Sequence, residues 1–112
     1  MRPISVGKNL TANTATTLYT VPTGYYANCV HLHVANSTAS NKHISLSWYD
    51  LSASLNIPIT FETTVSSKTS FDAISSTQYF VMEEGDYIIA TSESGSTMSI
   101  IGTFEQIGLT RA

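Results

Sequence analysis

The sequence predicts an all-β domain, an antiparallel β-sandwich of about seven to eight strands with jelly-roll or Ig-like connections. Apolar and polar residues alternate over several short segments, as they do in strands that bury one face. Ser and Thr supply 32 of the 112 residues, and their short polar side chains disfavour helix interiors. Turn-forming residues recur at intervals of roughly 8–12 residues, which is typical of small sandwiches and barrels. A chain of this length has room for one core, so residues 1–112 are expected to form a single domain.

The clearest alternation runs from Asn28 to Asn36. In this segment Val30, Leu32 and Val34 are predicted to face the core. The opposite phase comprises Cys29, His31, His33 and Ala35. The same pattern recurs from Lys42 to Asp50, after a polar loop of turn-forming residues. Two alternating segments joined by a short polar loop predict an antiparallel hairpin.

The segments on either side are less regular. Thr16–Val21 is predicted to be a strand that ends at a turn containing proline and glycine. Residues 57–62 alternate as well, but Pro58 has no N–H to donate to a ladder. This strand is therefore predicted to lie at a sheet edge or to carry a bulge. The stretch Val65–Ser76 is weakly patterned, and it is predicted to be a loop with short extended pieces.

The C-terminal third is again clearly patterned. Gln78–Met82 and Tyr87–Ser92 are predicted to be a strand and its return strand, joined by the acidic turn Glu83–Asp86. A last strand is predicted from Met98 onward. Ile101 falls in the outward phase of that strand, which makes it a candidate contact residue.

The charge pattern argues against some classes of function and favours others. Charged residues make up 12% of the chain, about half the usual share, and the net charge is −3. No nucleic-acid surface is predicted because the basic residues are scattered along the chain. No apolar run has the length of a membrane span or a signal peptide, so a soluble protein made in the cytoplasm is expected. A surface with few ions is easier to desolvate, which favours self-association and coverage by neighbouring chains.

Three histidines are the candidate metal ligands. His31 and His33 share one face of a predicted strand, and His43 is expected opposite them across the predicted hairpin. Imidazoles in such an arrangement bind transition-metal ions. A moderately polar surface strand explains the same residues without an ion. We favour that interpretation because a metal site needs a full set of ligands, and no cofactor is predicted.

No catalytic residues are predicted, and the chain is not expected to be an enzyme. The acidic residues Glu83, Glu84 and Asp86 surround a glycine in a tight turn, where carboxylates are ordinary solvated turn formers. Cys29 is predicted to share a strand face with His31, but no oxyanion donor or third residue accompanies the pair. A lone cysteine is more often a small buried apolar group.

Aromatic side chains supply the other candidates for a contact surface. Tyr25, Tyr26 and Tyr49 are expected to be exposed, and together with Ile101 they are the interface candidates. Exposed aromatic residues with few charges around them are typical of protein interfaces. They are also typical of a sugar-binding platform, and that alternative stays open.

Four motifs follow one another along the chain, and a last strand such as Met98 to Ile107 comes after them. The motifs are Leu18-Tyr19-Thr20-Val21-Pro22-Thr23-Gly24, Val34-Ala35-Asn36-Ser37, Ile44-Ser45-Leu46-Ser47-Trp48-Tyr49-Asp50 and Glu84-Gly85-Asp86-Tyr87-Ile88-Ile89-Ala90. Their order resembles a pattern found in small virion proteins of tailed bacteriophages. The resemblance extends over most of the chain, from Thr16 to Ile107. It implies a β-sandwich subunit that is present in several copies in the phage particle.

The resemblance implies a structural role rather than a catalytic one. The subunit would pack against itself and against other virion proteins, at the tail or neck or as a decoration protein on the capsid. The particle would be assembled in the cytoplasm of the bacterial host. The alternative within the same particle is a β-sandwich module of the tail that binds a host glycan or another receptor.

Overall fold

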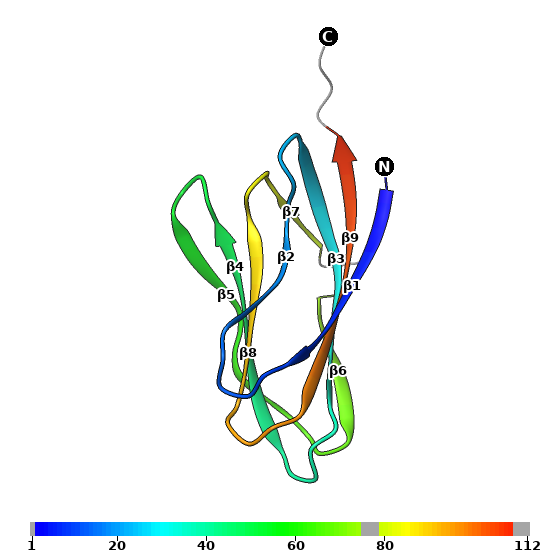
Figure 1. Cartoon of the computed structure of the whole chain (residues 1–112), viewed down its shortest axis with the longest axis vertical. Helices are drawn as coiled ribbons and strands as arrows, with labels where there is room; N and C mark the ends of the chain where they lie inside the picture. The colour runs from blue at the N-terminus through cyan, green and yellow to red at the C-terminus, as the bar shows by residue number, and fades with distance from the viewer. Residues whose placement is uncertain (1, 75–78, 109–112) are drawn as a thin grey trace.

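The computed structural model describes residues 2–74 and 79–108, which form nine strands in two antiparallel sheets (Figure 1). Sheet A has the strand order β1-β9-β3-β6, with β7 also paired to β3, and sheet B has the order β2-β8-β4-β5. The strands are β1 (Arg2–Leu10), β2 (Thr16–Thr20), β3 (Tyr25–Asn36), β4 (Lys42–Asp50), β5 (Leu55–Val65), β6 (Thr69–Ile74), β7 (Phe80–Met82), β8 (Tyr87–Ser92) and β9 (Met98–Gly108). The predicted all-β antiparallel sandwich is confirmed.

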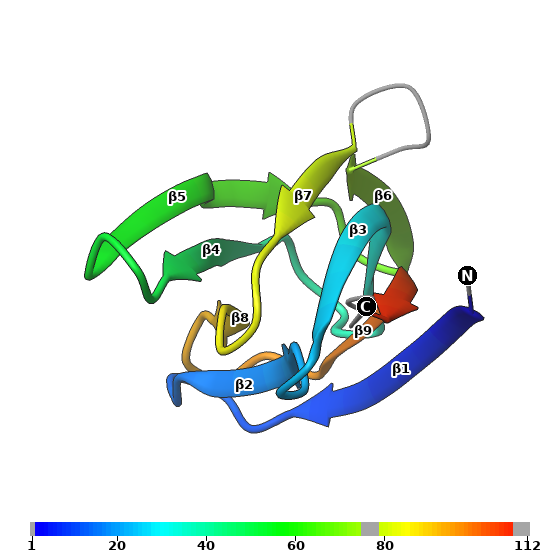
Figure 2. The same ribbon diagram turned by 90° about the horizontal axis from the view of Figure 1, so that it is seen from above.

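The connections follow the jelly-roll plan. β6 pairs with the second half of β3 and β7 with its first half, so these two short strands together occupy the place of one. Each sheet is then four strands wide, which is the eight-strand jelly-roll arrangement. Seen from above, the strands of sheet B lie on one side and those of sheet A on the other (Figure 2). None of the residues within 2–74 and 79–108 forms a helix that is long and apolar enough to cross a membrane.

The two predicted hairpins are wrong. β3 and β4 lie in different sheets, and so do β7 and β8. Alternation shows that one face of a strand is buried, but it does not show whether the next strand pairs beside it or packs across the core. Within the described part of the chain, consecutive strands pair with each other in the β4–β5 hairpin, which turns at residues 51–54.

A β-bulge inverts the predicted phase in the first half of β3. The register of β3 against β9 shifts between Cys29 and His31. Cys29 is completely buried and Val30 is half-buried, the reverse of the prediction for both residues. An extra residue in one strand moves the following side chains to the other face, so the predicted phase holds for Leu32 and Val34, which lie after the bulge.

Two strands were not predicted. β1 pairs with β9 along its whole length. β6 lies in the stretch 65–76 that the sequence predicts to be a loop with short extended pieces, and it pairs with β3 as a strand of six residues. Ser75 and Ser76 from that stretch, and Gln78 from the predicted strand 78–82, lie outside the described residues.

The prediction for Pro58 is confirmed, because β5 is an edge strand and also carries bulges. Among the described strands it pairs with β4 alone, and its register against β4 shifts twice. At one of these shifts Phe61 and Glu62 together oppose Ser45, and Glu62 has a φ of 48°. This bulge turns Phe61 outward, and its side chain is 73% exposed. The regular alternation predicted over residues 57–62 is therefore interrupted.

The core lies between the two sheets. Phe104 of β9 is fully buried and stacks on Tyr19 of β2, with ring centroids 4.0 Å apart. The buried Gln106 amide donates a hydrogen bond of 2.6 Å to the Tyr19 hydroxyl, which satisfies both polar groups inside the sandwich. Gly102 permits this packing, because a Cβ there would lie 2.8 Å from the Phe104 ring and 2.9 Å from Leu18.

Candidate functional site

The structure brings two of the three candidate metal ligands together. His31 Nε2 lies 2.9 Å and His33 Nδ1 2.7 Å from the same oxygen, Oδ1 of Asp72. His43 does not join them, because β4 belongs to sheet B. Its Nε2 lies 3.6 Å from Glu93 Oε1. We call His31, His33 and Asp72 the His–Asp cluster.

The His–Asp cluster lies on the outer face of sheet A. In the register of the sheet, Asp72 of β6 stands beside His33 of β3, and His33 stands beside Ile101 of β9. Hydrogen bonds from His33 and then from His31 hold the pKa of the Asp72 carboxyl below its ordinary value. Sequence reasoning missed Asp72 because its segment was predicted to be a loop.

The remaining interface candidates lie on separate surfaces. Tyr25 and Tyr26 line a surface hollow of about 420 Å³, together with Val81 and the carboxylates of the acidic turn. Tyr49 is half-buried on the outer face of sheet B and stacks on Tyr87, with ring centroids 4.9 Å apart. Ile101 is 47% exposed on the outer face of sheet A, as its phase predicts. These residues do not form one continuous patch.

A second group of exposed apolar side chains lies on the edge strand β5 and in the turn before it. We define the β5 patch as Leu51, Leu55, Ile57 and Phe61, all of which are exposed. The β4–β5 hairpin extends away from the rest of the sandwich at one end of the molecule (Figure 1 and Figure 2). Sequence reasoning missed this patch because residues 57–62 alternate like a strand whose apolar face is covered. Pro58 predicts an edge strand or a bulge, but it does not indicate the bulge at Phe61–Glu62 or the divergence of the hairpin.

Tyr25, Val81 and Tyr79 form a smaller group, which we call the β7 patch. Their exposed fractions lie between 39% and 55%. Beneath it, Phe80 points inward and packs on Trp48 of β4, with ring centroids 5.3 Å apart. β7 is thus a short strand with one face in the core and an apolar side chain on the other.

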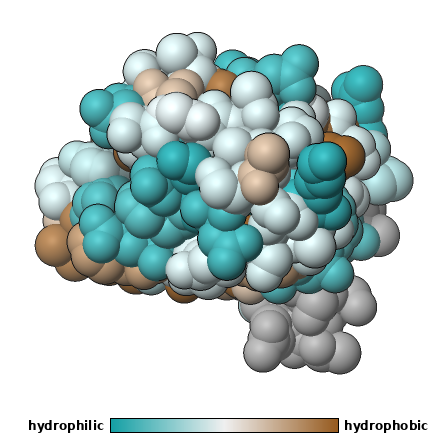
Figure 3. Space-filling view, turned by 90° about the horizontal axis from the view of Figure 1, so that it is seen from below, coloured by the Kyte–Doolittle hydropathy of each residue, from teal (hydrophilic) through white to brown (hydrophobic). Residues whose placement is uncertain are grey.

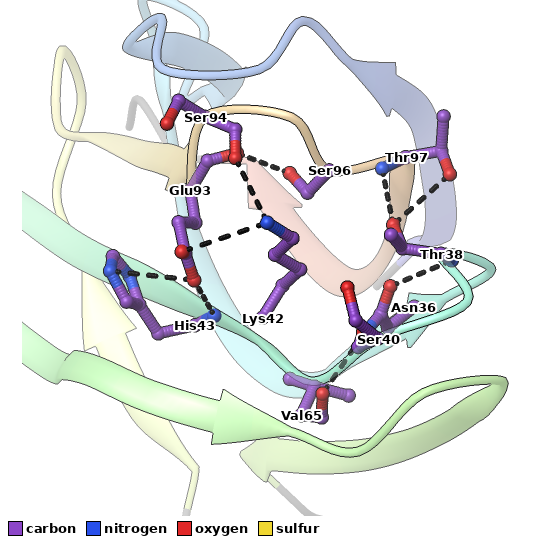
Figure 4. Close-up of polar contacts among 10 residues, drawn as sticks. All are labelled: Asn36, Thr38, Ser40, Lys42, His43, Val65, Glu93, Ser94, Ser96 and Thr97. Carbon is purple, nitrogen blue, oxygen red and sulfur yellow. Dashed lines mark hydrogen bonds and ion pairs between the residues drawn. The ribbon is translucent and has the colours of Figure 1, made fainter.

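The opposite end of the sandwich is polar and internally bonded. This lower end comprises loops 11–15, 36–41, 66–68 and 93–97, which contain no large apolar residue. Teal and white atoms cover most of it, and brown atoms lie mainly towards its margins (Figure 3). Thr38 accepts a 2.6 Å hydrogen bond from the Thr97 N–H, and Lys42 donates to the Ser94 carbonyl at 3.3 Å (Figure 4). Its hydroxyls and amides largely bond to one another.

Buried Asn36 connects the two sheets at this lower end. Its amide nitrogen donates to the carbonyl of Val65, the last residue of β5, at 2.9 Å, and to Ser40 O at 3.1 Å. Its amide oxygen accepts from the Thr38 N–H at 2.9 Å (Figure 4). Every hydrogen-bonding group of this side chain therefore has a partner.

The prediction that the acidic turn is solvated is wrong for Asp86, which is completely buried. Its carboxylate accepts hydrogen bonds from Trp48 Nε1 at 3.1 Å, Leu51 N at 3.0 Å and Glu83 N at 2.9 Å. The carboxylate thereby fixes the start of the β4–β5 turn. This is a structural role, and a single acidic residue in a turn has no sequence pattern that reveals it.

Within residues 2–74 and 79–108, Cys29 has no partner for nucleophilic chemistry. Burial raises the pKa of its thiol to about 12, so the thiol stays protonated at neutral pH. The bulge in β3 places Cys29 in the core and the His31 side chain on the outer face. The expectation that the two share a face is therefore wrong.

No family model and no curated protein sequence matches the chain. Among solved structures, the chain is similar to a Bacillus endospore appendage from a novel family of disulfide-linked pili. The identity is 12% and the TM-score 0.56, over 97% of this chain and 87% of that chain. The chain is also similar to the globular domain of zebrafish complement 1qA protein, at 14% identity and a TM-score of 0.47, over 96% and 98% of the two chains. The first likeness shows a shared fold alone, and neither shows a phage origin.

Proposed function

We propose that this chain is a structural subunit of a bacteriophage particle that assembles by packing the β5 patch against other protein chains. The observation that supports this most is the exposure of three large apolar side chains on the edge strand β5, together with Leu51 in the turn before it. Contiguous exposed apolar surface of this kind marks interaction sites in soluble proteins.

The backbone of β5 adds a second attractive element. An edge strand presents unpaired N–H and C=O groups that a strand of another chain can bond. Natural edges are usually protected by charged residues, especially lysine, by proline and by bulges. β5 has Pro58 and bulges but a single charged residue, Glu62, so its protection by charge is weak. An edge that combines apolar side chains with free backbone groups is suited to permanent coverage.

The placement in a phage particle rests on the motif resemblance. The four motifs fall on β2 with its following turn, on the end of β3, on β4, and on the acidic turn with β8. The partners would be further copies of this chain and other virion proteins, at the tail or neck or on the capsid surface. The proposal includes no catalytic activity, no nucleic-acid partner and no membrane.

Light scattering coupled to size-exclusion chromatography tests the packing role. We expect the purified chain to form an oligomer, and the double variant Leu55→Asp/Phe61→Asp to be a folded monomer. The matched control Ser94→Asp adds a charge at the exposed turn of the lower end and should leave the oligomer intact. Ile101→Asp and Tyr49→Asp test the other two surfaces in the same assay. A monomeric wild-type chain at high concentration would contradict the proposal.

The phage placement needs its own experiment. An antibody raised against the chain should label purified particles of the source phage at a regular position in electron micrographs. Absence of the chain from purified particles, measured by mass spectrometry, would contradict the placement and leave the packing role to the first experiment.

The second candidate function is binding of a host glycan by the tail of the particle. The hollow lined by Tyr25 and Tyr26 favours it, because Glu83 and Glu84 lie beside the two aromatic rings. Aromatic rings with a few polar groups beside them are typical of sugar-binding sites. A glycan array discriminates the two functions, since this candidate predicts binding that is lost in Tyr26→Ala and retained in Phe61→Asp.

A further inference from the structure

We propose that the His–Asp cluster binds a divalent transition-metal ion of the Zn²⁺ class on the outer face of sheet A. His31 and His33 each place a ring nitrogen within 3 Å of one Asp72 oxygen, and the three donor atoms lie within 4.8 Å of one another. This site is independent of the proposed packing role, because it lies on the other sheet from β5.

The spacing of the donor atoms suits a tetrahedral ion. With metal–ligand distances of about 2.0–2.2 Å, the donor atoms of a tetrahedral zinc site lie about 3.4 Å apart. The two observed nitrogen–oxygen distances are 2.9 Å and 2.7 Å. Insertion of an ion therefore requires the side chains to open by about 0.5–0.7 Å, which rotation of exposed side chains supplies.

The types of donor select the class of ion. Two imidazoles and one carboxylate match the nitrogen and oxygen ligands that zinc and its neighbours prefer. Calcium and magnesium require several oxygen ligands, and this cluster offers one carboxylate. Each histidine binds through the ring nitrogen that now lies beside Asp72, so a neutral ring must carry its proton on the other nitrogen.

The fold places the donors before any ion arrives. His31 and His33 follow the bulge in β3 and share the outer face, while Asp72 is set opposite His33 by the pairing of β3 with β6. Two ligands come from one strand and the third from a strand about 40 residues further along the chain. The ion therefore binds the folded chain better than the unfolded one and ties β6 to β3.

Isothermal titration calorimetry of the full chain with zinc chloride tests this site. We expect close to one Zn²⁺ per chain for the wild type, and an affinity lowered by about 100-fold or more in His33→Gln and in Asp72→Asn. The matched control is His43→Gln, which removes an imidazole from sheet B and should bind zinc like the wild type. Circular dichroism checks that each variant is folded.

A thermal melt gives an independent readout. When free zinc exceeds the dissociation constant about 100-fold, Tm of the wild type should rise by about 8–14 °C, and EDTA should reverse the rise. Neither ligand variant should show the shift. Zinc binding that is clearly below one ion per chain in the wild type, undiminished in both ligand variants, or lost in the His43 variant would overturn the proposal.

Discussion

The strands β1 and β5 both lie at sheet edges, but they differ in the residues that limit pairing with a strand of another chain. β1 carries Arg2 and Lys8, which are residue types that keep a strand edge from pairing with another chain, whereas Glu62 is the single charged residue of β5. Each strand also contains one proline, Pro3 or Pro58. No exposed large apolar side chain of the described residues belongs to β1, whereas β5 alone has three. The comparison shows that the low charge of the whole chain is less informative than its distribution between the edges.

The same contrast holds for how each edge is attached. β1 is held by its ladder with β9. The β4–β5 hairpin is in addition fixed by buried polar side chains, Asp86 at the turn and Asn36 at the end of β5. An edge that must present apolar side chains to a partner gains from being held in one conformation, because pre-organisation lowers the cost of binding.

Removal of the Asp86 carboxylate should have the largest effect on the β5 edge. Asp86→Ala leaves the Trp48, Leu51 and Glu83 N–H groups without their acceptor, and we expect it to lower the free energy of unfolding by about 3–5 kcal/mol. Urea denaturation measures the change. Asp86→Asn retains one oxygen acceptor and should cost less, so equal losses in the two variants would contradict this account.

Loss of the Asn36 amide should have the next largest effect. Asn36→Leu keeps the size of the side chain but leaves the buried Val65 carbonyl unpaired, for an expected loss of about 2–3 kcal/mol. Asn9→Leu, at an exposed asparagine of β1, is the control and should cost at most about 1 kcal/mol. A smaller loss at Asn36 than at Asn9 would show that the lower end of β5 is not held in this way.

Removal of one hydroxyl, that of Ser45, should slightly destabilise the bulge that exposes Phe61. Ser45 accepts a 2.9 Å hydrogen bond from the Glu62 N–H, so Ser45→Ala should lower stability by about 1 kcal/mol. Ser47→Ala on the same strand lacks this contact and serves as the control. Chemical shifts of Phe61 in the Ser45 variant should move further than those of residues on β1.

Lowering the pH should destabilise the β4–β5 hairpin before it destabilises β1, and the effect should be small. The backbone N–H of His43 donates to Glu93 and holds the pKa of that carboxyl below its ordinary value. Ionised Glu93 therefore stabilises the fold at and above its unfolded pKa, and this contribution is lost as the pH falls through the lowered pKa. A plot of Tm against pH should have a flatter acid limb in Glu93→Gln than in the wild type. Parallel acid limbs would rule out this contribution.

Much of the fold followed from the sequence, because alternation reports burial directly. The strands β2, β4, β8 and β9 and the edge position of Pro58 were predicted from pattern and chemistry alone. The assignment of neighbours to different sheets was not predictable, since a strand with one apolar face looks the same beside a partner and across the core. β1 was missed because Lys8 interrupts the apolar phase formed by Ile4, Val6 and Leu10.

The candidate surfaces were harder to predict for a related reason. Two bulges, at Cys29–His31 in β3 and at Phe61–Glu62 in β5, decide which side chains reach the surface, and neither contains a glycine to mark it. Asp72 joined the histidines through pairing between strands that are distant in sequence. Residue types suggested ligands and contacts, but the register between strands determined which of them meet.

Hydrogen–deuterium exchange tests the contrast between the two edges most directly. The chain is compared at two concentrations about 100-fold apart, so that mass action changes the assembled fraction. We predict that amides of β5 gain protection at the higher concentration, while those of β1 exchange equally at both. Protection gained on β1 with none on β5 would contradict the central claim.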